Sequence, residues 1–218
     1  MFREHQELNG HLNGDGTASV EKYFRGLSTL IPQLPYAGID GIVSAIVQAS
    51  DEDRTVFIFG NGGSAATASH VMCDLNKGTS GPDSGQRLRA MALTDNIPLI
   101  TAWANDSAYE HVFSEQLKNF VQRRDVAFAI STSGDSVSVL RALETARGHG
   151  AITVGLTGHQ GGRMKPLCDI CAVVPSENMQ MIEDMHHAIV HSVFFMVREK
   201  LQSRSPKLLV AQAGRSRR

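Results

Sequence analysis

The sequence predicts an α/β fold: a doubly wound, five-stranded parallel sheet flanked by helices, with an N-terminal helical pair. Five short apolar runs lack polar alternation, which is typical of strands covered on both faces of a parallel sheet. Helical patterns lie between several of these runs, as expected for βαβ units. A chain of 218 residues is long enough for one well-buried domain of this kind.

The elements are expected in the following order. Apolar residues recur at helical spacing over residues 19 to 31, and Pro32 and Pro35 end this first helix. A second helix follows, with Ile39, Ile42, Val43, Ile46 and Val47 on one face. The five expected strands are 55–60, 88–93, 126–131, 152–157 and 169–174. Further helices are expected at 65–76, 107–122, 136–148 and 179–202.

These elements form a single domain over residues 18–203, between a mobile tail at 1–17 and a basic tail at 204–218. The last helix carries AIVHSVFFMV, which is apolar nearly all round. Such a helix is buried, and in a small domain an oligomer interface is a natural place to bury it. We therefore expect a homo-oligomer.

Composition excludes several classes of protein. A net charge of −1 argues against nucleic-acid binding as the main function. The basic tail has no interleaved aromatic residue, which also argues against a nucleic-acid site there. No apolar run approaches the roughly 20 residues of a membrane span, and the polar start MFREHQELNG is no signal peptide. Three cysteines are too few for a disulfide framework, so a cytoplasmic location is expected.

Cys168 and Cys171 form an isolated CxxC pattern, which can mark a metal or redox pair. The pattern runs into DICAVVP, residues 169–175, which has the character of a strand. Residues three apart on a strand point to opposite faces. A buried structural role is therefore favoured over joint chemistry.

The stretch FGNGGSAATASH, residues 59–70, directly follows the first expected strand. Its Gly-x-Gly-x-x-Ala pattern fits a loose dinucleotide fingerprint, but the polar side chains Asn61 and Ser64 crowd the loop. That fingerprint also expects an acidic residue at the end of the second strand, where the chain offers only Asp83 in a loop and Asp95 beyond the strand. A smaller phosphorylated compound fits this loop better.

A second loop, STSGDS at residues 131–136, follows the third strand and begins a helix. Its hydroxyls, backbone amides and helix dipole suit one phosphate group. The loop has no lysine and carries Asp135, so it is not a triphosphate-binding loop of the Walker type. The alternative is that Ser136 is only a helix N-cap. With strand order 2-1-3-4-5, strands one and three are neighbours, and both loops face one crevice.

Three motifs together resemble the sugar isomerase (SIS) domain and, within it, the phosphoheptose isomerase branch: GNGGSAATASH, ALTDNIPLITAWANDSAYEHVFSEQL and ISTSGDSVSVLRALETARGHGAITVGLTGHQGGRM. The resemblance runs from about residue 37 to 200. It implies the 2-1-3-4-5 sheet, a homotetramer with active sites at subunit interfaces, and isomerisation of the ketose sedoheptulose 7-phosphate to a heptose aldose phosphate.

The resemblance also implies roles for named residues. The phosphate of the sugar would be held by Ser131, Thr132, Ser133 and Ser136. The rest of the sugar would be lined by Asn61, Gly62, Gly63, Ser64, Asn105, Asp106 and Glu183. The metal ligands, with zinc as the expected ion, would be His70, Asp74, Glu183 and His191.

Two of these positions depart from the family pattern. The family has Glu where this chain has Asp74, and Gln where it has Glu183. Moving a carbonyl between neighbouring carbons through an enediol needs a base, an acid and a group that stabilises the oxyanion. Because Asp74 is shorter than glutamate, we expect Glu183 to be the base and His191 the acid.

One geometric difficulty accompanies this assignment. Glu183 and His191 are eight residues apart, which is a rise of about 12 Å on a straight helix. A helix that starts near Glu183, or a neighbouring subunit, would resolve it. His187 lies between them and continues a polar stripe. Two other functions stay open: a non-enzymatic SIS-fold binding protein like those associated with the replication initiator, and an isomerase for another sugar phosphate.

Overall fold

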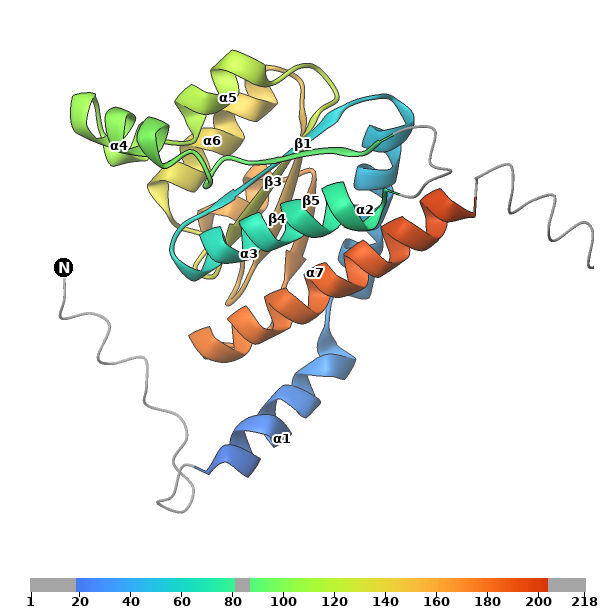
Figure 1. The fold of residues 1–218 in the computed structure, drawn as a ribbon. Coiled ribbons are helices and arrows are strands. Elements are labelled where there is room, and N and C mark those ends of the chain that lie inside the picture. The colour runs from blue at the N-terminus through green and yellow to red at the C-terminus, as the bar shows by residue number, and fades with distance from the viewer. Residues whose placement is uncertain (1–18, 81–86, 204–218) are drawn as a thin grey trace, which may run out of the picture.

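The computed structural model describes residues 19–80 and 87–203 (Figure 1). The two expected tails, at 1–17 and 204–218, lie outside the described residues. Within them, five parallel strands form one sheet in the order β2-β1-β3-β4-β5. The strands are β1 (Thr55–Gly60), β2 (Arg89–Ala92), β3 (Val126–Ser131), β4 (Ile152–Thr157) and β5 (Ile170–Val173). The predicted sheet and its order are confirmed.

The sheet is covered on both faces, as the apolar strands predicted. Every residue of β1 and β3 is buried. Val56 and Ile58 of β1 belong to one core, whereas Phe57 and Phe59 belong to the other. The first core is completed by α2 (Tyr36–Asp51), α3 (Gly63–Cys73) and α7 (Met179–Gln202). The second is completed by α5 (Ser114–Phe120), α6 (Val137–Gly148) and the 3-10 helix η5 (Gly162–Leu167).

The N-terminal helical pair is also confirmed. Helix α1 (Val20–Leu30) begins at Ser19 and continues into the short 3-10 helix η2 (Ile31–Gln33) before α2. Figure 1 shows α1 beyond α7, outside the layers that cover the sheet. A hydrogen bond of 2.6 Å from the Tyr23 hydroxyl to the Asp184 carboxylate joins the two helices. This bond and burial raise the pKa of Tyr23 to about 12.

No single helix among residues 19–80 and 87–203 has the length and apolar character of a membrane span. The pair Val20–Gln33 and Tyr36–Asp51 meets that test only together, across a bend of 72°. Helix α2 buries its apolar face against the sheet instead.

The single helix expected at 107–122 is wrong. A ten-residue helix, α4 (Ile97–Asp106), ends just before this segment, which contains the 3-10 turn η4 (Tyr109–His111) and α5. Asn96 caps α4 by accepting a hydrogen bond from the Leu99 N–H, and Pro98 lies in the first turn. This cap and proline are the start signals that the hydrophobic pattern alone does not show.

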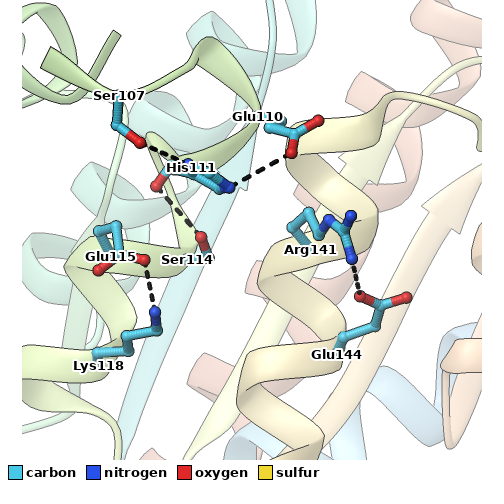
Figure 2. Close-up of polar contacts among 8 residues, drawn as sticks. All are labelled: Ser107, Glu110, His111, Ser114, Glu115, Lys118, Arg141 and Glu144. Carbon is cyan, nitrogen blue, oxygen red and sulfur yellow. Dashed lines mark hydrogen bonds and ion pairs between the residues drawn. The ribbon is translucent and has the colours of Figure 1, made fainter.

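Local polar contacts hold the break between α4 and α5 (Figure 2). The Ser107 hydroxyl contacts His111 Nδ1 at 2.8 Å, and the other ring nitrogen lies 3.3 Å from the Glu110 carboxylate. The Ser114 hydroxyl donates to the His111 carbonyl at 3.2 Å. The chain therefore turns around His111 and does not continue as one helix.

The expectation that Cys168 and Cys171 point to opposite faces of one strand is wrong as well. Strand β5 begins at Ile170, so Cys168 precedes it, and the chain bends at Asp169. The Asp169 carboxylate accepts hydrogen bonds from the main-chain N–H and the hydroxyl of Thr153, both at 2.9 Å. These bonds hold the bend, and the alternation of faces along a strand does not extend to Cys168.

Candidate active site

The two glycine- and serine-rich loops lie side by side at the carboxyl ends of β1 and β3. Gly60, the last residue of β1, is paired with Ile130 of β3. The Asn61 amide donates to the Ser138 hydroxyl at 3.0 Å, which links the first loop to the start of α6. The Tyr109 hydroxyl donates to the other end of the same amide at 2.9 Å. The crevice expected between the two loops is therefore bordered by α3 on one side and α6 on the other.

The STSGDS loop is built around its glycine. Gly134 has a φ of 69°, a left-handed conformation that favours glycine, and its N–H donates to the buried Ser131 hydroxyl at 3.2 Å. The exposed Ser133 hydroxyl accepts from the Asp135 N–H at 3.2 Å. Ser136 is the N-cap residue of α6, yet its side chain makes no capping hydrogen bond. Its hydroxyl is therefore not used to cap α6.

The one acidic group of this loop is paired. The Asp135 carboxylate lies 3.2 Å from Arg163 Nε and accepts from the Arg163 N–H at 3.0 Å. Arg163 belongs to η5, which follows β4. Both side chains are more than half exposed, so the pair contributes little to stability. It does balance the charge that a phosphate in this loop would meet.

Helix α3 and helix α7 pack against each other through a row of functional side chains. A side chain placed at Gly63 would begin 3.3 Å from the Glu183 carboxylate oxygens. One turn further on, the Thr67 hydroxyl contacts His187 Nε2 at 3.1 Å. Partners in this row are 120 or 121 residues apart, which means that the two helices run in the same direction. The polar stripe expected on α7 therefore faces α3 (Figure 1).

At the end of this row, three metal-binding side chains converge. His191 Nε2 lies 2.9 Å from His70 Nε2, and His70 Nε2 lies 3.2 Å from Asp74 Oδ2. Their ligand atoms all lie within 4.8 Å of one another. Two imidazoles and a carboxylate are ligands that Zn²⁺ and other divalent transition metals accept. The residues fit a metal ion, and they are partly exposed, so an ion and a substrate oxygen can reach them.

Asp74 lies at an irregularity that the sequence does not reveal. Helix α3 ends at Cys73, and Asp74 begins a π-helical turn, η3 (Asp74–Gly78). A side chain at Gly78 would begin 2.3 Å from the Phe194 ring of α7, so the turn is pressed against that helix. Single π turns inside helices are frequent at functional sites.

Glu183 is separated from the three converging side chains. Helix α7 begins at Met179, where the Asn178 side chain accepts from the Met181 N–H at 3.0 Å, and it continues unbroken past His191. The helix starts about one turn before Glu183, so Glu183 and His191 both lie on it, and a start near Glu183 does not bring the two side chains to one ion. Glu183 lies beside the first loop at Gly63, about two helical turns from His191.

Asn105 and Asp106 lie apart from this row. They end α4, are exposed, and bond to each other at 2.7 Å from the Asn105 amide to the Asp106 carboxylate. Figure 1 places α4 at the edge of the molecule, away from α3 and α7. Neither residue belongs to the converging group of His70, Asp74 and His191. The nearby Tyr109, however, reaches Asn61 of the first loop.

The sequence analysis missed His186, which is 1% exposed at the inner side of α7. Burial lowers the pKa of this histidine to about 4, although a hydrogen bond with the Thr157 backbone opposes the shift. Its Nε2 has no hydrogen-bond partner among the described residues. Two histidines in succession on an apolar helix were the only signal, since one of them must face inward.

Comparison with known proteins identifies the class of this fold and site. A sequence model described as "SIS domain" matches residues 22–158. The chain belongs to the SIS domain family. Within the family, its similar relatives are phosphoheptose isomerases, and the chain belongs with this group.

Three relatives illustrate the extent of the similarity. The phosphoheptose isomerase of Rhodospirillum rubrum is 41% identical over 165 residues, which cover 75% of this chain and 84% of the relative. That of Helicobacter hepaticus is 35% identical over 185 residues, 85% of this chain and 86% of the relative. The structure of the Neisseria gonorrhoeae phosphoheptose isomerase superposes with a TM-score of 0.77 at 26% identity, covering 83% and 97% of the two chains.

Proposed function

We propose that this protein is a phosphoheptose isomerase, an aldose–ketose isomerase that converts sedoheptulose 7-phosphate to a heptose 7-phosphate through an enediol. The observation that carries the proposal is the convergence of His70, Asp74 and His191, with His70 on α3, the helix that follows the first loop, and Asp74 directly after it. A binding protein has no need of such a convergence. The relatives of similar length that bear this name support the same activity.

The phosphate group of the sugar binds in the STSGDS loop. Ser131, Thr132, Ser133 and Ser136 surround the N-terminus of α6, where free N–H groups and the helix dipole favour an anion. The unused Ser136 hydroxyl supports this assignment over a simple cap. The sugar chain then extends over Asn61, Gly62, Gly63 and Ser64 of the neighbouring loop.

We assign the metal ion, with zinc as the expected element, to His70, Asp74 and His191. When bound there, a divalent cation stabilises negative charge on the substrate oxygen during enolisation. Glu183 would be a fourth ligand only if it came from a neighbouring subunit, because about two helical turns separate it from His191 within one chain.

Glu183 is the proposed base and His191 the proposed acid. Asp74 already contacts His70 at 3.2 Å, which ties this shorter carboxylate to the metal group. Glu183 instead lies against Gly63, where the sugar chain would pass. In that position it would remove a proton from the carbon next to the carbonyl. Because about two helical turns separate Glu183 from His191 in one chain, the acid acting with it would be His191 of a neighbouring subunit.

The active protein is proposed to be a homo-oligomer, with a tetramer as the expected form. Exposed apolar side chains on α1 and α7 support this: Val20, Phe24, Phe195 and Met196 are 76%, 63%, 51% and 41% exposed. Asn105 and Asp106 are proposed to line the sugar from the end of α4, because Tyr109, three residues beyond Asp106, bonds to Asn61 of the first loop. A cytoplasmic location is proposed from the cysteine usage.

The test combines metal analysis with an isomerisation assay on sedoheptulose 7-phosphate. We expect one divalent ion per site and formation of the aldose, both lost on chelation and restored by zinc. His70→Ala is the matched variant, since it removes a ligand without touching the phosphate loop. Protein that binds the sugar but forms no aldose even after zinc is added would favour the binding-protein function. Turnover of a different sugar phosphate would identify the alternative isomerase.

A further inference from the structure

The CxxC pair lies outside the proposed active site, and its two thiols come together in the fold. Cys171 belongs to β5 and is paired in register with Gly155 of β4. A side chain placed at Gly155 would begin 2.7 Å from Cys168 Sγ and 3.2 Å from Cys171 Sγ. Both sulfurs therefore occupy the space above one glycine, on the same side of the sheet.

The surroundings make the two thiols chemically different. Its hydrogen bond to Cys171, followed by burial, raises the pKa of the Cys168 thiol. The same hydrogen bond lowers the pKa of Cys171, and the positive charge of Lys165 acts in the same direction. Burial opposes ionisation of Cys171, but the two shifts together favour Cys171 over Cys168 as the thiol that ionises first. Both residues are partly exposed, so a small oxidant can reach them.

We propose that Cys168 and Cys171 are a redox modification site, at which a peroxide converts the two thiols into a reversible intrachain disulfide. The Cys171 thiolate attacks the peroxide, breaks its O–O bond and becomes a sulfenic acid, with release of hydroxide. Cys168 then loses its proton and attacks Cys171 Sγ, so that an S–S bond forms and water leaves. In total, two thiols are oxidised and one hydrogen peroxide is reduced to two waters.

The site is connected to the STSGDS loop through η5. Cys168 is the residue at which η5 ends. At the other end, a side chain on Gly162 would begin 2.5 Å from the Ser133 carbonyl oxygen. The Met164 N–H donates to the Gly134 carbonyl at 2.9 Å, and Arg163 pairs with Asp135. A disulfide at Cys168 would therefore fix one end of the element whose other end contacts the loop.

We infer that oxidation changes the affinity of the protein for sugar phosphate, and this part of the inference rests on the proposed function. Closing the S–S bond requires Cys168 to move toward Cys171. Because Gly162 and Met164 contact the loop backbone directly, a shift of η5 displaces Gly134. We expect the KM for sedoheptulose 7-phosphate to rise about tenfold in the oxidised protein, since loss of one contact to an anion has this size.

The first experiment detects the bond without reference to activity. The reduced full-length protein is treated with hydrogen peroxide and examined by intact mass and non-reducing peptide mapping. We expect a mass lower by two hydrogens, a peptide linked through Cys168 and Cys171, and full reversal by dithiothreitol. Cys168→Ser should stop at the sulfenic acid on Cys171, whereas Cys73→Ser, the matched control, should still form the bond. Persistence of both thiols while Cys73 is oxidised would overturn the proposal.

The second experiment tests the connection to the loop. Binding of sedoheptulose 7-phosphate is measured by calorimetry, and its turnover by assay, for reduced and oxidised wild type and for Cys168→Ser. Weaker binding in oxidised wild type alone supports the connection, and equal affinity in both states overturns it. If the protein neither binds nor turns over this sugar, the proposed function has failed, while the peptide map still decides the disulfide.

Discussion

Two serines occupy the same N-cap position in two helices, but their hydroxyls are used differently. Ser19, at the start of α1, accepts a hydrogen bond from the Lys22 N–H at 3.1 Å. Ser136, at the start of α6, makes no such bond. Their backbones differ as well, with φ and ψ of −124° and 149° at Ser19 and −60° and 116° at Ser136. A side-chain hydrogen bond from an N-cap serine stabilises a helix, and α6 lacks this bond at Ser136.

The difference distinguishes polar groups that complete the fold from polar groups that remain available to a ligand. Asn96 and Asn178 cap their helices, as Ser19 does. Ser136 lies at the crevice between the two loops, and Glu183 borders the same crevice at Gly63. Replacing a group of the first kind should lower stability, and replacing one of the second kind should lower binding or turnover.

The largest expected effect concerns His186, which belongs to neither kind. It is buried away from any ligand, and its Nε2 has no hydrogen-bond partner among the described residues. Its pKa is lowered to about 4 in the folded protein, from an ordinary value near 6.5. Between these values the unfolded chain binds more protons, so stability is lost as pH falls from about 6.5 to about 4. The loss attributable to His186 is roughly 3 kcal/mol at most.

Denaturant unfolding at several pH values measures this effect. In His186→Asn, the amide can keep the bond to the Thr157 backbone but cannot be protonated. The variant should lose less stability than wild type over that pH range. His149→Asn is a suitable control, since that histidine is exposed and follows α6. Equal pH dependence in wild type and His186→Asn would contradict a neutral, buried imidazole.

The second effect concerns Glu183, a carboxylate of the second kind, which is available to a ligand. Glu183→Gln should lower turnover by 100-fold or more, about 2.7 kcal/mol of barrier, because the amide cannot accept the substrate proton. Thermal stability and zinc content should be nearly unchanged. The assay is kcat for sedoheptulose 7-phosphate, with metal analysis of the same preparation. A fully active Glu183→Gln beside an inactive Asp74→Asn would show that Asp74 is the base.

The sequence predicts the scaffold of this site better than its internal geometry. The strands and the ends of α6 and α7 follow from apolar runs and helix signals that are local in the chain, whereas the sheet order was implied by the family resemblance. The pairing of Thr67 with His187 depends on how α3 and α7 pack, and no local pattern specifies that register. The π turn at Asp74 and the bend at Asp169 are set by Phe194 and Thr153, which lie far away in the sequence. The π turn positions Asp74 in the metal group, and the bend at Asp169 lies between the two thiols of the CxxC pair.

The third effect concerns Ser136 itself. Ser136→Ala should weaken binding of sedoheptulose 7-phosphate by about 1.5–3 kcal/mol, the range for a hydrogen bond to a charged group. The melting temperature should stay nearly constant, because no capping bond is lost. Calorimetric titration and thermal denaturation on the same sample separate the two outcomes. Lower stability with unchanged affinity would mean that Ser136 serves only as a cap.

The smallest expected effect completes the comparison at Ser19. Ser19→Ala removes the bond to the Lys22 N–H and should destabilise α1 by about 1 kcal/mol. Helix α1 lies outside the layers that cover the sheet, so the loss should appear as local opening and not as global unfolding (Figure 1). Hydrogen exchange of the α1 amides measures it, and we expect about fivefold faster exchange there.

The same variant should leave sugar-phosphate affinity unchanged, since Ser19 lies at the start of α1 and the phosphate loop is at the start of α6. Ser19→Ala and Ser136→Ala thus form a matched pair, because both replace an N-cap serine by alanine. The first should change the hydrogen exchange of α1, and the second should change the affinity for the sugar phosphate. Tyr23 keeps its bond to Asp184 in either variant, so α1 stays attached to α7. If Ser19→Ala also lowered affinity, α1 would contribute to the active site, as it could across a subunit interface, and its exposed Val20 and Phe24 would mark that contact.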